Sequence, residues 1–81
     1  MSSARFRKIR EKLELTQGEL AEVLGLSGKE VVSRIEAGTR NPSKLAMAVM
    51  EILGESSPRK ANELIELLKA HVAKITKDSN E

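Results

Sequence analysis

The 81-residue sequence contains no cysteine, tryptophan or tyrosine, and Phe6 is its one aromatic residue. Without cysteine, neither a disulfide framework nor a thiolate metal site can hold the chain together. Stability must then come from an aliphatic core, and a chain of this length has room for one such core. The sequence also lacks an apolar leader and any run long enough to cross a bilayer. We therefore expect a cytoplasmic protein with no membrane partner.

Residues typical of catalytic sites are equally scarce. His71 is the one histidine, and no glycine-rich phosphate loop, nucleophile elbow or His-Glu-x-x-His motif occurs. The carboxylates are spread over charged stretches instead of being gathered in an apolar segment. The sequence therefore predicts no enzymatic activity, no cofactor and no metal site.

The net charge of +2 is small, but it is distributed unevenly. Residues 1–44 hold nine Lys/Arg and six Asp/Glu, a net charge of +3, whereas residues 45–81 hold five and six, a net charge of −1. Basic runs usually lie on solvated helix faces, so this bias is weak evidence by itself. It agrees with a polyanion partner for the first half of the chain.

Hydrophobic residues recur at helical spacing along the whole chain, and no alternating strand pattern is present. The sequence predicts an all-α fold with helices at about 3–14, 16–24, 29–37, 44–53 and 58–76. We expect residues 1–54 to form a helical bundle and residues 55–81 to form a longer C-terminal helix with a frayed tail.

Local residues indicate where these helices begin and end. Thr16 and Glu19 have the spacing of a capping box, in which each side chain accepts a hydrogen bond from the other residue's backbone. Gly25, Gly38 and Gly54 are placed to end the second, third and fourth helices. Because the turn between the second and third helices is short, these helices must cross steeply, as in a helix-turn-helix.

The fourth and fifth predicted helices carry much of the hydrophobic surface. The fourth is apolar nearly all round, so we expect it to be buried beneath the other three. The apolar stripe of the fifth is wider than four short helices can cover, which leaves two alternatives: the helix folds back over its own domain, or it forms a symmetric dimer contact. The stripe consists of Ala61, Leu64, Ile65, Leu67, Leu68, Val72 and Ile75.

A motif in the first two thirds of the chain resembles a known family. Its residues are Arg10-x-x-Leu13-x-Leu15-Thr16-Gln17-x-x-Leu20-Ala21-x-x-Leu24-Gly25-Leu26-Ser27, then Val32-Ser33-Arg34-Ile35-Glu36-x-Gly38-x-Arg40-x-Pro42-Ser43. This pattern is similar to the Xre/Cro-type helix-turn-helix regulators of bacteria and phages. The resemblance implies a five-helix bundle of the lambda-repressor-like type, with a third helix that reads DNA. It also implies a homodimer on a near-palindromic operator, for which the apolar stripe makes the C-terminal helix the expected contact.

The resemblance assigns roles to individual residues. Arg10 and Glu36 match positions that form a partly buried ion pair, although two independent solvated charges are the alternative. Contacts to the DNA backbone are expected from Gln17, Gly28, Arg40, Asn41 and Lys44. Contacts to base edges are expected from Lys29, Glu30, Val31, Ser33 and Arg34, whose side chains suit guanine, cytosine and the thymine methyl group.

One departure from the family pattern affects the base-reading residues. Gly25 and Glu36 are eleven steps apart, where the family has ten, so one extra residue precedes or enters the third helix. If the family pattern is aligned from Gly25 forward, Val31 is buried. If it is aligned from Glu36 backward, Val32 is buried and Val31 faces outward. We favour the second register, with the extra residue at 27–28, because Val32 and Ile35 then share a face.

Two functions agree with these features. The first is a transcriptional regulator, most simply a repressor that occupies its operator. The alternative is an antitoxin that binds its toxin through the long C-terminal helix and also represses its own operon. Both bind double-stranded DNA, and they differ in the partner of residues 58–76.

Overall fold

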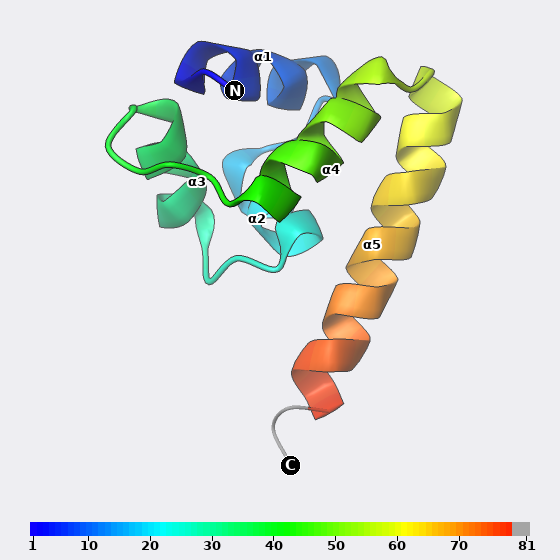
Figure 1. Ribbon diagram of the computed structural model, residues 1–81. Helices are drawn as coiled ribbons and strands as arrows, with labels where there is room; N and C mark the ends of the chain where they lie inside the picture. The colour runs from blue at the N-terminus through cyan, green and yellow to red at the C-terminus, as the bar shows by residue number, and fades with distance from the viewer. Residues whose placement is uncertain (79–81) are drawn as a thin grey trace.

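The computed structural model describes residues 1–78, in which five helices and no strands are present (Figure 1). The all-α prediction is confirmed. No helix within residues 1–78 combines the length and hydropathy needed to span a bilayer. The helices are α1 (Ser3–Lys12), α2 (Gln17–Leu24), α3 (Lys29–Glu36), α4 (Lys44–Glu55) and α5 (Pro58–Asp78).

Hydroxyl side chains cap the first turns of α1, α2 and α4. The predicted capping box at α2 is present: Thr16 Oγ1 accepts from the Glu19 backbone N–H at 3.1 Å, and Glu19 Oε1 accepts from the Thr16 N–H at 2.9 Å. Ser2 and Ser43 accept from the third residue after them at 3.1 Å. These bonds satisfy amides that have no partner inside a helix, so the starts of the helices follow from local sequence.

The first three helices share one kind of C-terminal ending. A residue in the left-handed region follows each helix: Glu14 (φ 59°), Gly25 (φ 68°) and Gly38 (φ 81°). The helix expected to reach Glu14 therefore ends at Lys12. In each case two backbone N–H groups donate to carbonyls of the last turn, which is the Schellman pattern. The donors and acceptors are Glu14 and Leu15 to Glu11 and Arg10, Gly25 and Leu26 to Glu22 and Ala21, and Gly38 and Thr39 to Ile35 and Arg34.

Gly54 does not end α4, contrary to the sequence-based expectation, because the helix continues to Glu55. A Cβ atom at position 54 would lie 3.3 Å from Cδ1 and Cγ1 of Ile9. The absence of a side chain thus lets α4 approach α1 closely. Lys12 adds a second link at this point, since its Nζ donates to the Gly54 carbonyl at 2.8 Å.

The core has two adjoining parts. The larger joins α1, α2, α3 and α4 through Phe6, Ile9, Leu20, Ala21, Val31, Val32, Ile35 and Met50. The smaller joins α2, α4 and α5 through Val23, Leu53, Ala61 and Ile65. The first half of α5 is therefore folded back onto its own bundle.

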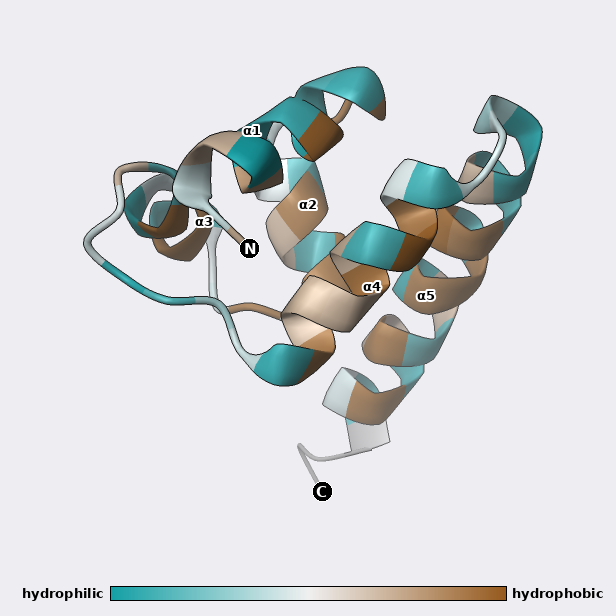
Figure 2. Cartoon of the chain, turned by 45° about the horizontal axis from the view of Figure 1, so that its top comes forward, coloured by the Kyte–Doolittle hydropathy of each residue, from teal (hydrophilic) through white to brown (hydrophobic). Residues whose placement is uncertain are grey.

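The fourth helix is less buried than its sequence suggests. Leu45 is 74% exposed and Ile52 is 55% exposed, although Ala46, Met50 and Leu53 are buried. The reason is that α4 packs between α1 and α5 with one side facing outward, so the expectation of burial nearly all round is wrong. Figure 2 shows hydrophobic residues on both α4 and α5 where these helices lie side by side.

We predict that Glu14→Gly stabilises the fold by roughly 0.5–1 kcal/mol, since glycine adopts the left-handed conformation without the steric cost borne by glutamate. Glu14→Ala is the matched control and should give no comparable gain, because alanine keeps that cost. Urea unfolding of the three proteins measures the effect. Equal stability of Glu14→Gly and Glu14→Ala would contradict it.

Candidate nucleic-acid interface

A bidentate ion pair connects the ends of the helix-turn-helix region. Arg10 of α1 donates from Nε to Glu36 Oε2 at 2.6 Å and from Nη2 to Glu36 Oε1 at 3.0 Å. The Arg10 side chain is 13% exposed and that of Glu36 is 5% exposed, so the two side chains pair instead of lying separately in solvent. This contact joins the last turn of α1 to the end of α3.

Two further hydrogen bonds extend this pair into a network. Arg10 Nη1 donates to the Leu15 carbonyl at 2.9 Å, and Gln17 Nε2 donates to Glu36 Oε1 at 3.1 Å. The network therefore holds the α1–α2 turn, the first residue of α2 and the last residue of α3 in one arrangement. Sequence reasoning did not predict the bond between Gln17 and Glu36.

The network also determines the protonation of its members. Burial would raise the pKa of Glu36, but hydrogen bonds from Arg10 and Gln17 and the charge of Arg10 outweigh it, so this pKa lies below its ordinary value of 4.5. The pKa of Arg10 is raised, mainly by its hydrogen bond to Glu36. Both groups are therefore charged at neutral pH.

The outer surface of α3 is polar. Lys29, Glu30, Ser33 and Arg34 are all exposed, and the helical period places them on one face. This exposed face belongs to a helix at the edge of the bundle, on the left of Figure 1. This face offers two cations, one carboxylate and one hydroxyl to a partner.

Val31 does not belong to this outer face. It is 6% exposed and packs in the core beside Val32, which is 0% exposed. The expected outward orientation of Val31 is therefore wrong. Since α3 packs against both α1 and α2, its buried sector is wide enough for two neighbouring valines, and neither of the two proposed registers describes it alone.

The start of α3 has no side-chain cap. Gly28 occupies the N-cap position in an extended conformation, and no side chain accepts a hydrogen bond from the first turn. The Glu30 carboxylate folds back over this glycine. It comes so close that a Cβ atom at position 28 would lie 2.8 Å from Glu30 Oε2. A carboxylate is favourable near the positive end of a helix dipole.

Three further polar residues lie near this face. Arg40 and Asn41 are exposed in the loop after α3, and Lys44 is exposed at the start of α4. In Figures 1 and 2 this loop lies beside α3, whereas α5 lies on the far side of the bundle. The loop is anchored by Thr39, whose Oγ1 donates to the Arg34 carbonyl at 3.2 Å. Thr39 was not identified from the sequence.

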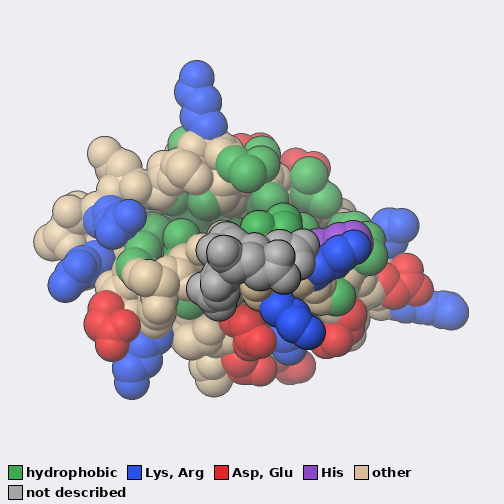
Figure 3. Space-filling view, turned by 90° about the horizontal axis from the view of Figure 1, so that it is seen from below, with side chains coloured by type: hydrophobic (Ala, Val, Ile, Leu, Met, Phe, Trp, Pro, Cys, Tyr) green, Lys and Arg blue, Asp and Glu red, His purple; other side chains and the backbone are tan. Residues whose placement is uncertain are grey.

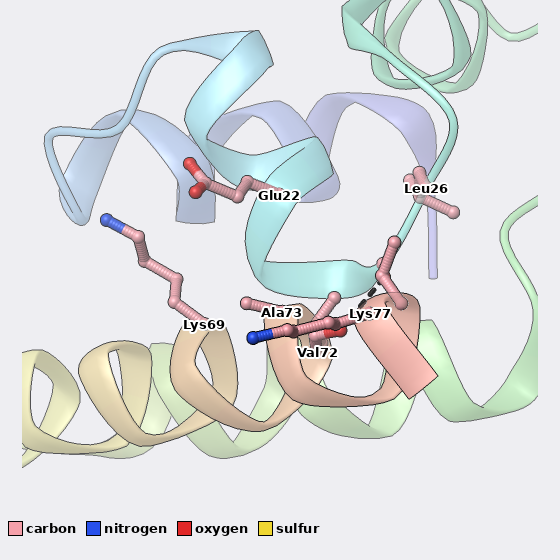
Figure 4. A pocket seen from close by; sticks show the side chains of 8 residues that line it. Glu22, Leu26, Lys69, Val72, Ala73 and Lys77 are labelled. Carbon is pink, nitrogen blue, oxygen red and sulfur yellow. Dashed lines mark hydrogen bonds between the residues drawn. The ribbon is translucent and has the colours of Figure 1, made fainter. Parts of the chain in front are cut away.

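The hollow drawn in Figure 4 lies outside this region. A cavity of about 500 Å³ separates the end of α2 from the last turns of α5, with Lys69 and Lys77 on one wall and Glu22 on the other. Among residues 1–78, no three His, Cys, Asp or Glu side chains are grouped so as to hold a metal ion. The polar residues of α3 and its neighbouring loop are therefore the strongest candidate site.

Comparison with known proteins identifies the region that carries this site. A family model described as helix-turn-helix matches residues 6–58, which is more than half of the chain. The match spans α2, α3 and α4 and ends at the first residue of α5. No curated protein and no solved structure matches the chain.

We predict that Glu36→Gln lowers the free energy of unfolding by about 3–5 kcal/mol at neutral pH, because it leaves the guanidinium of Arg10 without its anion in a largely buried place. Glu11→Gln is the control. It breaks the Arg7–Glu11 pair, whose side chains are 61% and 54% exposed, and should cost less than about 1 kcal/mol.

The pH dependence gives an independent check. Since the folded pKa of Glu36 is lowered, its stabilisation is present above the unfolded pKa and is lost as the pH falls through the folded pKa, below 4.5. The wild type should therefore lose stability on acidification more steeply than Glu36→Gln. Parallel acid profiles in urea unfolding would contradict this assignment.

Proposed function

Since this chain belongs to the Xre/Cro-type helix-turn-helix family of DNA-binding regulators, we propose that it recognises one double-stranded DNA sequence and represses transcription by occupying it. The observation that carries this proposal is the polar outer face of α3. The opposite face of the same helix is fixed by Val32 and Ile35, which are 0% and 2% exposed. A short rigid helix with a polar outer face suits the major groove.

Each side chain of this face has a chemical role in the proposal. Lys29 and Arg34 donate to the O6 and N7 acceptors of guanine, and Glu30 accepts from the N4 amino group of cytosine. Ser33 donates or accepts according to the base it meets. Val31 has no place in base reading because the core encloses it.

Contacts to phosphates set the position of α3 in the groove. We assign them to Arg40, Asn41 and Lys44, to the backbone N–H groups that follow Gly28, and to Gln17. The Gln17 amide has two N–H bonds, of which one is donated to Glu36. The other is available for a phosphate, and the bond to Glu36 orients it. Gln17 thus links the ion pair to the DNA backbone.

The regulator works as a homodimer on a near-palindromic operator in this proposal, because one α3 of eight residues contacts few base pairs. The alternative, an antitoxin whose toxin binds at the C-terminal helix, is favoured by one observation. Leu67 and Ile75 on α5 are 56% and 66% exposed, which leaves an apolar surface for a protein partner.

We predict that Arg34→Ala relaxes specificity at one base pair of each half-site, at a cost of about 1–3 kcal/mol on the preferred sequence. Lys44→Ala should weaken all duplexes alike and reduce the slope of log affinity against log salt by about 1, because it removes one phosphate contact. Fluorescence anisotropy at several salt concentrations, with single-base variants of the site, measures both.

Arg59→Ala is the control for these variants. Its side chain is 94% exposed at the start of α5, away from α3, so binding and salt slope should stay unchanged. If Arg34→Ala discriminates among base pairs as well as the wild type does, α3 does not read bases as proposed.

A further inference from the structure

The first helix carries a concentration of positive charge. α1 contains five basic residues and one acidic residue, a net charge of +4, whereas the whole chain has a net charge of +2. The surface is not cationic throughout, since the face seen from below shows acidic, basic and hydrophobic side chains together (Figure 3). Basic runs often lie on solvated faces, so the position of this helix decides whether its charge has a role.

Three of the five basic side chains of α1 are available to a partner. Arg10 and Lys12 are already engaged in hydrogen bonds within the protein. The other three are exposed: Arg5, Arg7 and Lys8. Within residues 1–78 these three form one ion pair, from Arg7 Nε to Glu11 Oε2 at 3.6 Å. That pair is weak, because its side chains are 61% and 54% exposed to solvent.

α1 borders the DNA-binding region at the end of α3. Arg10, near the end of α1, pairs with Glu36, the last residue of α3. Ser3, the first residue of α1, lies beside the turn that follows α3, since a Cβ atom on Gly38 would be 3.7 Å from Ser3 Oγ. Figures 1 and 2 both show α1 beside α3. The charge of α1 is therefore placed next to the helix that carries the candidate reading face.

A hollow of about 570 Å³ lies between the outer side of α1 and the end of α3. The three exposed cations of α1 line it from one side, and Glu36 lines it from the other. The carboxylate of Glu36 is already paired with Arg10, so Glu11 is the one other acidic group among the lining residues. The hollow is therefore cationic.

The ligand that suits this hollow is a phosphate diester. Each arginine presents paired N–H donors that match two phosphate oxygens, and the lysine adds a compact positive charge. Gln17 donates to the Glu36 carboxylate at 3.1 Å, and this same carboxylate lines the hollow. A DNA backbone that contacts Gln17 therefore comes within reach of the exposed cations of α1.

We propose that the outer side of α1 is a second phosphate-binding surface, on which Arg5, Arg7 and Lys8 contact the DNA backbone beside the phosphate bound by Gln17. This inference rests on the proposed function, because the duplex is the one that α3 recognises. A phosphate that binds here takes the place of Glu11 next to Arg7. The surface adds affinity without sequence preference, since phosphates carry no base information.

Neutral substitutions in the Arg7–Glu11 pair test the proposal, because they change binding in opposite directions. Arg7→Gln should weaken duplex binding about three- to tenfold near 0.1 M salt and reduce the slope of log affinity against log salt by about 1, since one phosphate contact is lost. Glu11→Gln should strengthen binding about twofold, because it removes the competing carboxylate. Fluorescence anisotropy at several salt concentrations measures both effects. Both side chains are more than half exposed, so circular dichroism should show folded helices.

Arg59 and Glu63 provide the matched control, because they form an exposed Arg–Glu pair of the same i,i+4 spacing on α5. Arg59→Gln and Glu63→Gln make the same changes of charge and should leave binding unchanged. If Arg7→Gln weakens binding no more than Arg59→Gln does, net charge alone acts and the proposal is overturned. Altered preference among base pairs in Arg7→Gln would also overturn it.

The proposed function is judged by a separate measurement, the discrimination among base pairs by the wild type and by Arg34→Ala. A wild type that binds one sequence specifically, with Arg7→Gln equal to Arg59→Gln, leaves the function standing and overturns the role of α1 alone. A wild type that binds no duplex overturns both.

Discussion

The ion pair between Arg10 and Glu36 is the interaction on which the geometry of the DNA-binding region depends. Its two partners lie at the end of α1 and the end of α3, and the same two side chains also hold the Leu15 carbonyl and the Gln17 amide. The guanidinium fork accepts few other arrangements, so the pair fixes direction as well as distance. An apolar contact in its place would leave the helices freer to shift.

The aliphatic core supplies the second constraint. With one aromatic residue available, the bundle packs around Phe6 and otherwise uses branched and straight aliphatic chains. Val31, Val32 and Ile35 give α3 a wide buried sector, and this leaves only a narrow polar face outside. Large hydrophobic side chains stay exposed on α4 and α5 in the described part of the chain.

Much of this arrangement follows from local sequence, because capping residues and left-handed glycines act within a few positions. The Thr16 capping box and the endings at Gly25 and Gly38 are of this kind. One error is local, since the left-handed Glu14 ends the first helix early, but the errors at Gly54 and Val31 concern contacts between distant segments. The sequence pattern marks Gly54 as a helix terminus, but in the fold this glycine makes room for Ile9. The pattern likewise places Val31 outward, but α3 packs against both α1 and α2, which buries it. Tertiary packing determines the role of such residues, and the residue pattern along one helix carries no information about it.

The central claim is that α3 reads a specific duplex sequence as part of a homodimer. Selection of bound sites from a pool of random duplexes tests it most directly, because sequence, symmetry and spacing are reported together. The account predicts an enriched near-palindrome whose half-site centres lie about one helical turn, roughly 10 base pairs, apart. Recovery of sequences without any shared motif would contradict it.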